Sequence, residues 1–130
     1  MVTLETKKTS VDTSLDCVVV PTNLGGIRGG RSLDLTGYPP TETCIKAGHV
    51  IIRDTVNNVY KPMPINDGAY ASLPANHEYV GILVNTIPVS APLASIMNIG
   101  QVNEAAAPFA FTSIKSAFKA AVPSVVFVKD

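Results

Sequence analysis

The chain has little charge of either sign. Charged residues make up 15% of its 130 residues, and ten basic side chains balance ten acidic ones. A chain without a positive excess has no field that favours nucleic acid or an anionic membrane. We therefore expect neither nucleic acid nor a membrane among its partners. Because 46% of the residues are hydrophobic and the net charge is zero, the surface is poorly protected against association.

Long hydrophobic runs and cysteines are also scarce. Pro, Asn, Gly and Lys interrupt every apolar run, so no stretch approaches the ~18 residues of a membrane span. The opening residues, MVTLETKKTS, lack the apolar run of a signal peptide. Cys17 and Cys44 are too few for a disulfide scaffold, and we expect both to be buried, reduced thiols. These features predict a soluble protein that is made in a cytoplasm.

Residues suited to metal, phosphate or nucleophilic chemistry do not form a recognisable motif. Cys17, Cys44, His49 and His77 could supply a Cys₂His₂ set, but none of their spacings is that of a tight zinc-ligand pair. The cluster from Gly25 to Gly30 lacks the Gly-Lys-Ser/Thr end of a phosphate loop, and it indicates flexibility. No serine stands in a G-x-S-x-G motif. We expect no cofactor, no metal and no catalytic residue, with a small β-barrel enzyme that uses a histidine as the alternative.

Residues 1–44 are rich in glycine and proline, as in LGGIRGGRS and TGYPPTET. This density disfavours a long helix or a central strand. We interpret residues 1–44 as an extended arm that becomes ordered on a partner. The run CVVV within it predicts a short strand, which either joins the sheet edge of a partner or forms an edge of its own domain. The candidate partner-binding residues, with two arginines for charge-assisted bonds, are Cys17, Val18, Val19, Val20, Arg28 and Arg31.

Residues 45–130 have the pattern of a compact β-rich domain. Strands are predicted at 49–54, 59–63, 78–84, 96–103 and 124–129. The run 78–84 is almost continuously apolar, as in a strand that is covered on both faces. Gly81 within this run indicates a bulge or a close backbone approach. Residues 96–103 alternate more weakly, so we expect that strand at an edge or a barrel rim.

One helix is predicted near the carboxyl end. The apolar side chains of TSIKSAFKAAVP, which starts at Thr112, share one face at helical spacing: Ile114, Ala117, Phe118 and Ala121. Thr112 or Ser113 can cap this helix, and Pro123 ends it. The predicted fold class is therefore mainly β: a small β-barrel or sandwich-like domain with one short packed helix near the C-terminus, preceded by an extended N-terminal arm.

Several short motifs follow one another through residues 45–130. An Ala-Gly pair precedes a strand, and a Lys-Pro segment, a Val-Gly-Ile-Leu strand, a Gly-x-Val-Asn strand and a helix before the last strand follow. This order resembles the head decoration and head fibre-base proteins of tailed bacteriophages. The matching residues are Ala47, Gly48, Lys61, Pro62, Val80, Gly81, Ile82, Leu83, Gly100, Val102 and Asn103. The segment before residue 45 agrees in character with arms of that family but matches no motif.

The resemblance implies a structural virion protein that is not an enzyme. Such a protein forms a homotrimer, binds the major capsid protein on the outer surface of the phage head and stabilises the capsid. The implied location is the virion, after synthesis in the cytoplasm of the host bacterium. The sequence has no heptads and no collagen-like repeat for a fibre stalk, which favours a short capsid decoration protein. A tail or baseplate adaptor of the same virion is the alternative.

Overall fold

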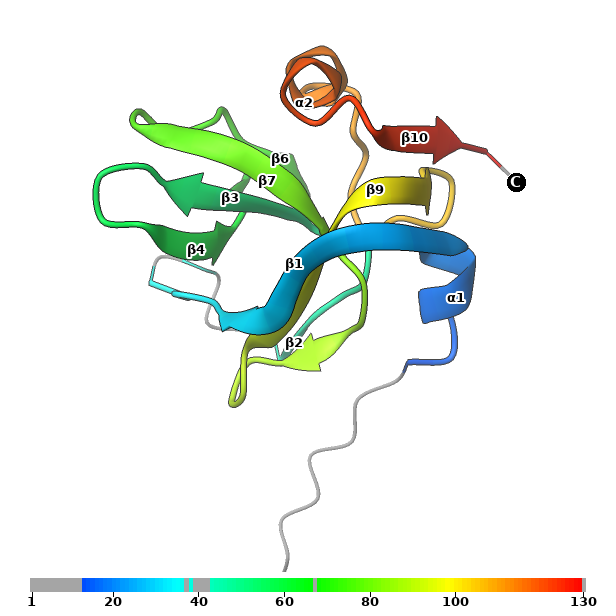
Figure 1. The fold of residues 1–130 in the computed structure, drawn as a ribbon, viewed down its shortest axis with the longest axis horizontal. Coiled ribbons are helices and arrows are strands. Elements are labelled where there is room, and N and C mark those ends of the chain that lie inside the picture. Colours follow the sequence, from blue (N-terminus) through cyan, green and yellow to red (C-terminus); the bar gives the residue numbers. More distant parts are fainter. Residues whose placement is uncertain (1–12, 37, 39–42, 67, 130) are drawn as a thin grey trace, which may run out of the picture.

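The computed structural model describes residues 13–36, 38, 43–66 and 68–129, and it is mainly β (Figure 1). Residues 1–12, the start of the predicted arm, lie outside the described residues. The elements in chain order are α1 (Asp16–Val19), β1 (Thr22–Ser32), β2 (Cys44–Ile45), β3 (Val50–Asp54), β4 (Val59–Pro62), β5 (Ile65–Asn66), β6 (Ala69–Tyr70), β7 (His77–Leu83), β8 (Ile87–Pro88), β9 (Leu93–Asn103), α2 (Lys115–Ala121) and β10 (Val125–Val128).

One curled sheet forms the centre of the molecule. Its strands lie in the order β1-β9-β7-β3-β4 with antiparallel neighbours, and β10 pairs with β9 in parallel. Leu33, just after β1, forms a bridge with Tyr60 of β4, so the two outer strands of this order approach each other. The sheet thereby curls into a half-barrel (Figure 1). The predicted fold class, a small mainly-β domain with one short helix near the C-terminus, is confirmed.

The strands predicted at 49–54, 59–63, 78–84 and 124–129 correspond to β3, β4, β7 and β10. Gly81 lies in β7 where the pairing register with β3 shifts. A Cβ atom at Gly81 would collide with the carbonyl oxygen of Met97 in β9. The bulge and the close backbone approach that this glycine indicated are therefore both present.

β9 is not the edge strand that its weak alternation predicted. It pairs with β1 on one side and with β7 and β10 on the other, which makes it an interior strand of the sheet. Its neighbouring residues Ile96 and Met97 are both buried, one in each hydrophobic cluster. Polar Asn98 and Gln101 remain half-buried beyond them. The strand is thus covered on both faces over only part of its length. Because the remaining positions are polar, its sequence has the weak alternation that is typical of an edge strand.

The prediction that residues 1–44 form an arm separate from the domain is wrong for the described part of that segment. The whole glycine cluster lies in β1, which pairs with β9. Glycine permits this pairing, because a Cβ atom at Gly26 would collide with the carbonyl oxygen of Ile96. Leu33 follows directly after β1 and is buried in the core, with 5% of its surface exposed. A separate domain therefore does not begin at residue 45.

Two hydrophobic clusters cover the two faces of the sheet, since consecutive residues of β3 belong to different clusters. The larger cluster, to which α2 contributes, consists of Val19, Val20, Ala47, Val50, Ile52, Met63, Tyr70, Tyr79, Ile82, Met97, Val102, Phe111, Ile114, Phe118, Val122 and Val125. The smaller one consists of Leu33, Ile45, Ile51, Leu83, Ile87, Ala94 and Ile96.

α2 lies within the predicted range but buries a narrower face than expected. Within the helix Phe118 is the buried residue, and the two cap residues four positions away on either side, Ile114 and Val122, are buried as well. Ala117 and Ala121 are exposed, contrary to the prediction. The expected side-chain cap is absent, because the helix begins at Lys115 and its N-cap residue is Ile114 and not Thr112 or Ser113. The Ser113 hydroxyl donates to the Tyr70 carbonyl at 3.3 Å. Tertiary packing rather than capping therefore holds the helix.

None of the described helices has the length and apolar character needed to cross a membrane. Cys17 and Cys44 are both free thiols, as predicted. Their burial differs from the prediction, since Cys17 is exposed and Cys44 is half-buried.

The packing of α2 can be tested with Phe118→Ala. The Phe118 side chain is fully buried and meets the rings of Tyr79 and Phe127 edge-on at centroid distances of 5.6 and 5.8 Å. We expect its removal to lower the free energy of unfolding by about 3–5 kcal/mol in urea titrations. Exposed Lys119→Ala on the same helix is the control and should change it by less than about 0.5 kcal/mol. A loss below about 1 kcal/mol for Phe118→Ala would contradict this packing.

Candidate functional site

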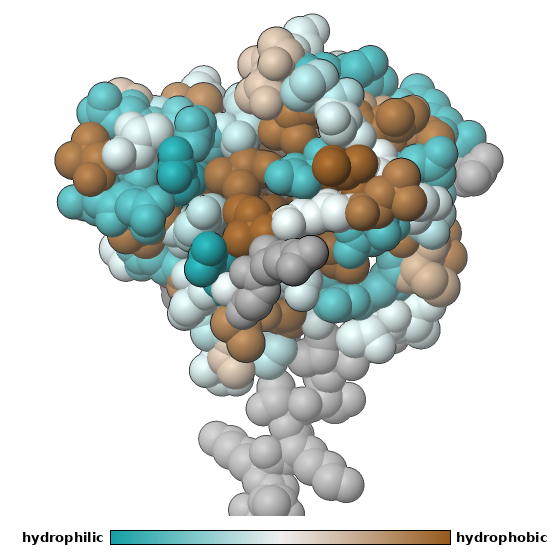
Figure 2. Space-filling model, in the orientation of Figure 1, coloured by the Kyte–Doolittle hydropathy of each residue, from teal (hydrophilic) through white to brown (hydrophobic). Residues whose placement is uncertain are grey.

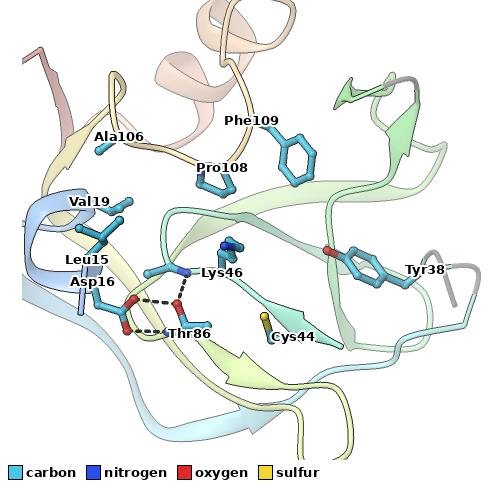
Figure 3. A pocket seen from close by; sticks show the side chains of 11 residues that line it. Leu15, Asp16, Val19, Tyr38, Cys44, Lys46, Thr86, Ala106, Pro108 and Phe109 are labelled. Atoms are coloured by element: carbon cyan, nitrogen blue, oxygen red, sulfur yellow. Dashed lines mark hydrogen bonds between the residues drawn. The ribbon is translucent and has the colours of Figure 1, made fainter. Parts of the chain in front are cut away.

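A hollow of about 410 Å³ lies beside α1. Its lining residues are Leu15, Asp16, Val19, Tyr38, Cys44, Lys46, Ala47, Thr86, Ala106, Pro108 and Phe109. Figure 3 shows the side chains of α1 on one side, Tyr38 and Phe109 on the other, and Cys44 and Lys46 between them. The volume falls within the ~300–1,000 Å³ that is usual for binding pockets. We take this hollow and the exposed surface of α1 as the candidate site.

α1 is held in place by the carboxylate of Asp16. Its oxygens accept hydrogen bonds from the backbone N–H of Thr86 at 2.8 Å and from the Thr86 hydroxyl at 2.7 Å. The Thr86 hydroxyl oxygen in turn accepts the Ala47 N–H at 3.0 Å. This network (drawn in Figure 3) ties α1 to the β8 region and to the turn before β3. The Asp16 carboxylate and the Thr86 hydroxyl thus form their hydrogen bonds to groups of the protein itself.

The CVVV run is therefore a single helical turn and not the predicted strand. An isolated turn of β-branched residues is unstable in water. Two contacts outside the helix compensate for this: the hydrogen bonds of Asp16, and the burial of Val19 and Val20 with 5% and 7% of their surfaces exposed. Pro21 follows at once and prevents a longer helix. Tertiary contacts thus override the strand propensity of this segment.

The structure separates the six candidate partner-binding residues. Cys17 and Val18 are exposed on α1, and Val18 has 45% of its surface exposed, but neither residue lines the hollow. Val19 and Val20 are core residues with 5% and 7% of their surfaces exposed, and Val19 also lines the hollow. That they contact a partner stays a prediction. Arg31 lies near the other end of β1, with its guanidinium 5.6 Å from the ring centre of Tyr60. The side chain of Arg28 lies outside the described part of the structure.

Most of the hollow could not be found from the sequence. Asp16 and Thr86 are 70 residues apart in the chain, and neither belongs to a motif. Leu15 and Lys46 likewise stand in no recognisable pattern. The only signal was the apolar run that includes Val18, and it identified the correct segment with the wrong secondary structure.

The candidate zinc ligands do not meet. The described residues contain no group of three or more His, Cys, Asp or Glu side chains that could hold a metal ion. His49 is fully buried, and its Nε2–H donates to the Met63 carbonyl at 3.1 Å. His77 instead lies at the start of β7, with Nδ1 2.8 Å from the Ala75 carbonyl.

His49 supports the wall of the hollow from behind. Three aromatic rings surround it edge-on, at centroid distances of 5.8 Å for Tyr38, 5.4 Å for Tyr70 and 5.6 Å for Phe109. Its Nδ1 has no hydrogen-bond partner among the residues that the structure describes. Burial lowers the pKa of His49 from 6.5 to about 4, although its hydrogen bond to Met63 opposes this shift. The ring is therefore neutral in the folded protein near pH 7.

Comparisons with known proteins add no assignment. No family model matches this chain. No curated protein matches it, and no solved structure matches it. The function must therefore be argued from the site itself and from the motifs in the sequence.

The buried imidazole predicts a loss of stability in mild acid. Above about pH 6.5 the ring is neutral in both states, so it has no effect on the stability. Below that pH the unfolded chain binds a proton that the folded protein does not, because the folded pKa is about 4. The free energy of unfolding should therefore fall by about 2 kcal/mol between pH 6.5 and 5.

Urea titrations of His49→Leu and of the native protein between pH 6.5 and 5 measure how much His49 contributes to the pH dependence of the free energy of unfolding. His49→Leu should have a flatter pH dependence, whatever its stability at pH 7. His77→Gln is the control and should keep the native slope. An unchanged slope in His49→Leu would show that His49 is not the group responsible.

Proposed function

We propose that this chain is a structural protein of a phage virion, a capsid decoration protein that attaches to the outer surface of the head through α1 and the hollow beside it. Its partner is the major capsid protein. The role is one of binding, without a catalytic step.

The observation that carries this proposal is the exposed apolar surface at α1, where Leu15 lines the hollow and Val18 lies on the outer surface of the same helical turn. Leu15 and Val18 have 65% and 45% of their surfaces exposed, and they belong to or adjoin one helical turn. Apolar side chains next to a hollow of this size are typical of protein-binding surfaces, where a few anchors supply most of the affinity.

The polar groups of the hollow support binding to a protein surface. Asp16 and Thr86 bond to each other, and a partner also meets the apolar wall formed by Val19, Pro108 and Phe109. Exposed Lys46 is the cationic side chain of the lining. A partner that offers an apolar side chain with an acidic group beside it would complement this arrangement.

Two of the residues on which the resemblance to phage head proteins rests, Gly48 and Asn103, lie near the walls of the hollow. Gly48 has a positive φ of 90°, and a Cβ atom there would collide with Val19 of α1. Asn103 is buried, and its side-chain oxygen accepts the Ala105 N–H at 3.1 Å at the start of the loop that carries Pro108 and Phe109. Both residues help to position the walls of the hollow. This supports the proposal that the motif residues and the hollow serve the same binding function.

Retention on phage particles tests the proposal. The native protein should co-sediment with heads purified from the phage that encodes it. Leu15→Glu and Val18→Glu should each weaken retention about tenfold or more, since they place a charge in the apolar contact. Val56→Glu is the matched control, because Val56 is 72% exposed in the turn between β3 and β4. It should bind as the native protein does.

Two results would contradict the proposal. Absence of the native protein from the head pellet would exclude the decoration role, and co-sedimentation with purified tails instead would identify the alternative tail or baseplate adaptor. Normal retention of Leu15→Glu and Val18→Glu would show that the hollow is not the contact surface.

A further inference from the structure

His49 is a buried base with one free ring nitrogen. None of its surface is exposed. Its Nε2–H donates to the Met63 carbonyl at 3.1 Å, while Nδ1 has no partner among the described residues. On the face of the molecule in Figure 2, hydrophilic side chains lie among the hydrophobic ones, so a charge there is hydrated. A proton on Nδ1 of His49 would instead be enclosed, away from solvent and without an acceptor.

Three aromatic rings enclose the imidazole, and two of them also belong to the wall of the hollow. Tyr38 and Phe109 line the hollow and are half-buried, and Figure 3 shows both across the hollow from α1. Tyr70 is the third ring. It is buried with 4% of its surface exposed, and its hydroxyl accepts the Val50 N–H at 3.1 Å. The least obstructed route from solvent to the imidazole therefore runs from the hollow, past Tyr38 and Phe109.

The groups around the imidazole do not offset a positive charge on it. The titratable groups that face the ring are the phenols of Tyr38 and Tyr70, and phenols remain neutral in mild acid. The charged side chains that line the hollow are Asp16 and Lys46. Neither is among the influences on the pKa of His49, which are burial and the hydrogen bond to Met63. A charge on His49 is therefore uncompensated as long as the wall stays closed.

We propose that the hollow opens in mild acid: protonation of His49 separates Tyr38 and Phe109 from the imidazole, and the opened wall releases the partner. The release of a partner rests on the proposed function, whereas the opening of the wall does not. The closed wall is the form that binds, because Phe109 is part of its apolar surface. His49 acts as a positioning residue, since it touches the wall of the hollow and not the partner.

The size of the effect follows from proton binding in the two forms. Burial holds the pKa of His49 at about 4 behind the closed wall, and the ring regains an ordinary pKa near 6.5 once water reaches it. Above about pH 6.5 the ring is neutral in both forms, so pH does not affect the wall. Below that pH the open form binds a proton that the closed form does not. The ratio of open to closed protein should therefore rise about twentyfold between pH 7 and 5.

Relaxation-dispersion NMR of the free protein measures the open form. Between pH 7 and 5, the open population reported by the ring signals of Tyr38 and Phe109 should rise about twentyfold. The rings of Phe118 and Phe127, which meet edge-on in the core at 5.8 Å, are the internal control. They should show no such rise, because the rest of the fold stays intact.

Two variants assign the effect to one histidine. His49→Leu should abolish the rise in the open population, and His77→Gln is the matched control that should retain it. An open population that does not change between pH 7 and 5 would overturn the proposal. So would equal exchange of Phe118 and Phe109, which would mean that the whole domain unfolds. Both of these results come from the native protein and do not depend on how His49→Leu folds. A rise that persists in His49→Leu would assign the effect to another group, such as Asp16.

Retention on purified phage heads separates this inference from the proposed function. Because the closed fraction alone binds, the affinity of the native protein should fall between pH 7 and 5 by up to about twentyfold. His49→Leu should bind equally at both pH values. Absence of binding at pH 7 would contradict the proposed function alone, since the NMR measurement decides whether the wall opens. Undiminished binding at pH 5 by a native protein whose wall has opened would contradict the release.

Discussion

Backbone contact at one point of β9 is the constraint on which the rest of the structure depends. Gly26 of β1 and Gly81 of β7 approach β9 from its two sides, against the carbonyl groups of the adjacent residues Ile96 and Met97. Any Cβ atom at either glycine would collide with those carbonyl oxygens. The two strands can therefore hold β9 closely between them, and close approach at glycines is a usual way for a sheet to bend. Ile96 and Met97 then enter opposite hydrophobic clusters and connect the two faces of the sheet.

The candidate site follows from the placement of β1. Because β1 lies against β9, the preceding turn of helix reaches the β8 region, where Asp16 bonds to Thr86 and one wall of the hollow forms. A single glycine-rich strand thus positions the helical turn through which we propose that a partner protein binds.

The sequence predicted the elements whose patterns are local. β3, β4, β7, β10 and α2 were found because alternation, apolar runs and helical spacing are visible within a few residues. β1 was missed because a glycine-rich segment has the same composition whether it is flexible or packed against a neighbouring backbone. That distinction depends on Ile96, about 70 residues later in the chain. The burial of Val19 and Val20 was missed for a similar reason, since the hydrogen bonds of Asp16 that make their segment helical are also distant in sequence. The hollow could not be predicted at all, because its lining comes from segments that only the fold brings together.

The most direct test of this account compares two neighbouring glycines of β1. A Cβ atom at Gly25 would lie 3.5 Å from the Ile99 side chain, an ordinary contact, whereas one at Gly26 would collide with the Ile96 carbonyl oxygen. In urea titrations, Gly25→Ala should change the free energy of unfolding by less than about 1 kcal/mol, and Gly26→Ala should lower it by at least about 2 kcal/mol. Equal and small effects of the two substitutions would contradict the packing of β1 on β9, and with it the placement of the hollow.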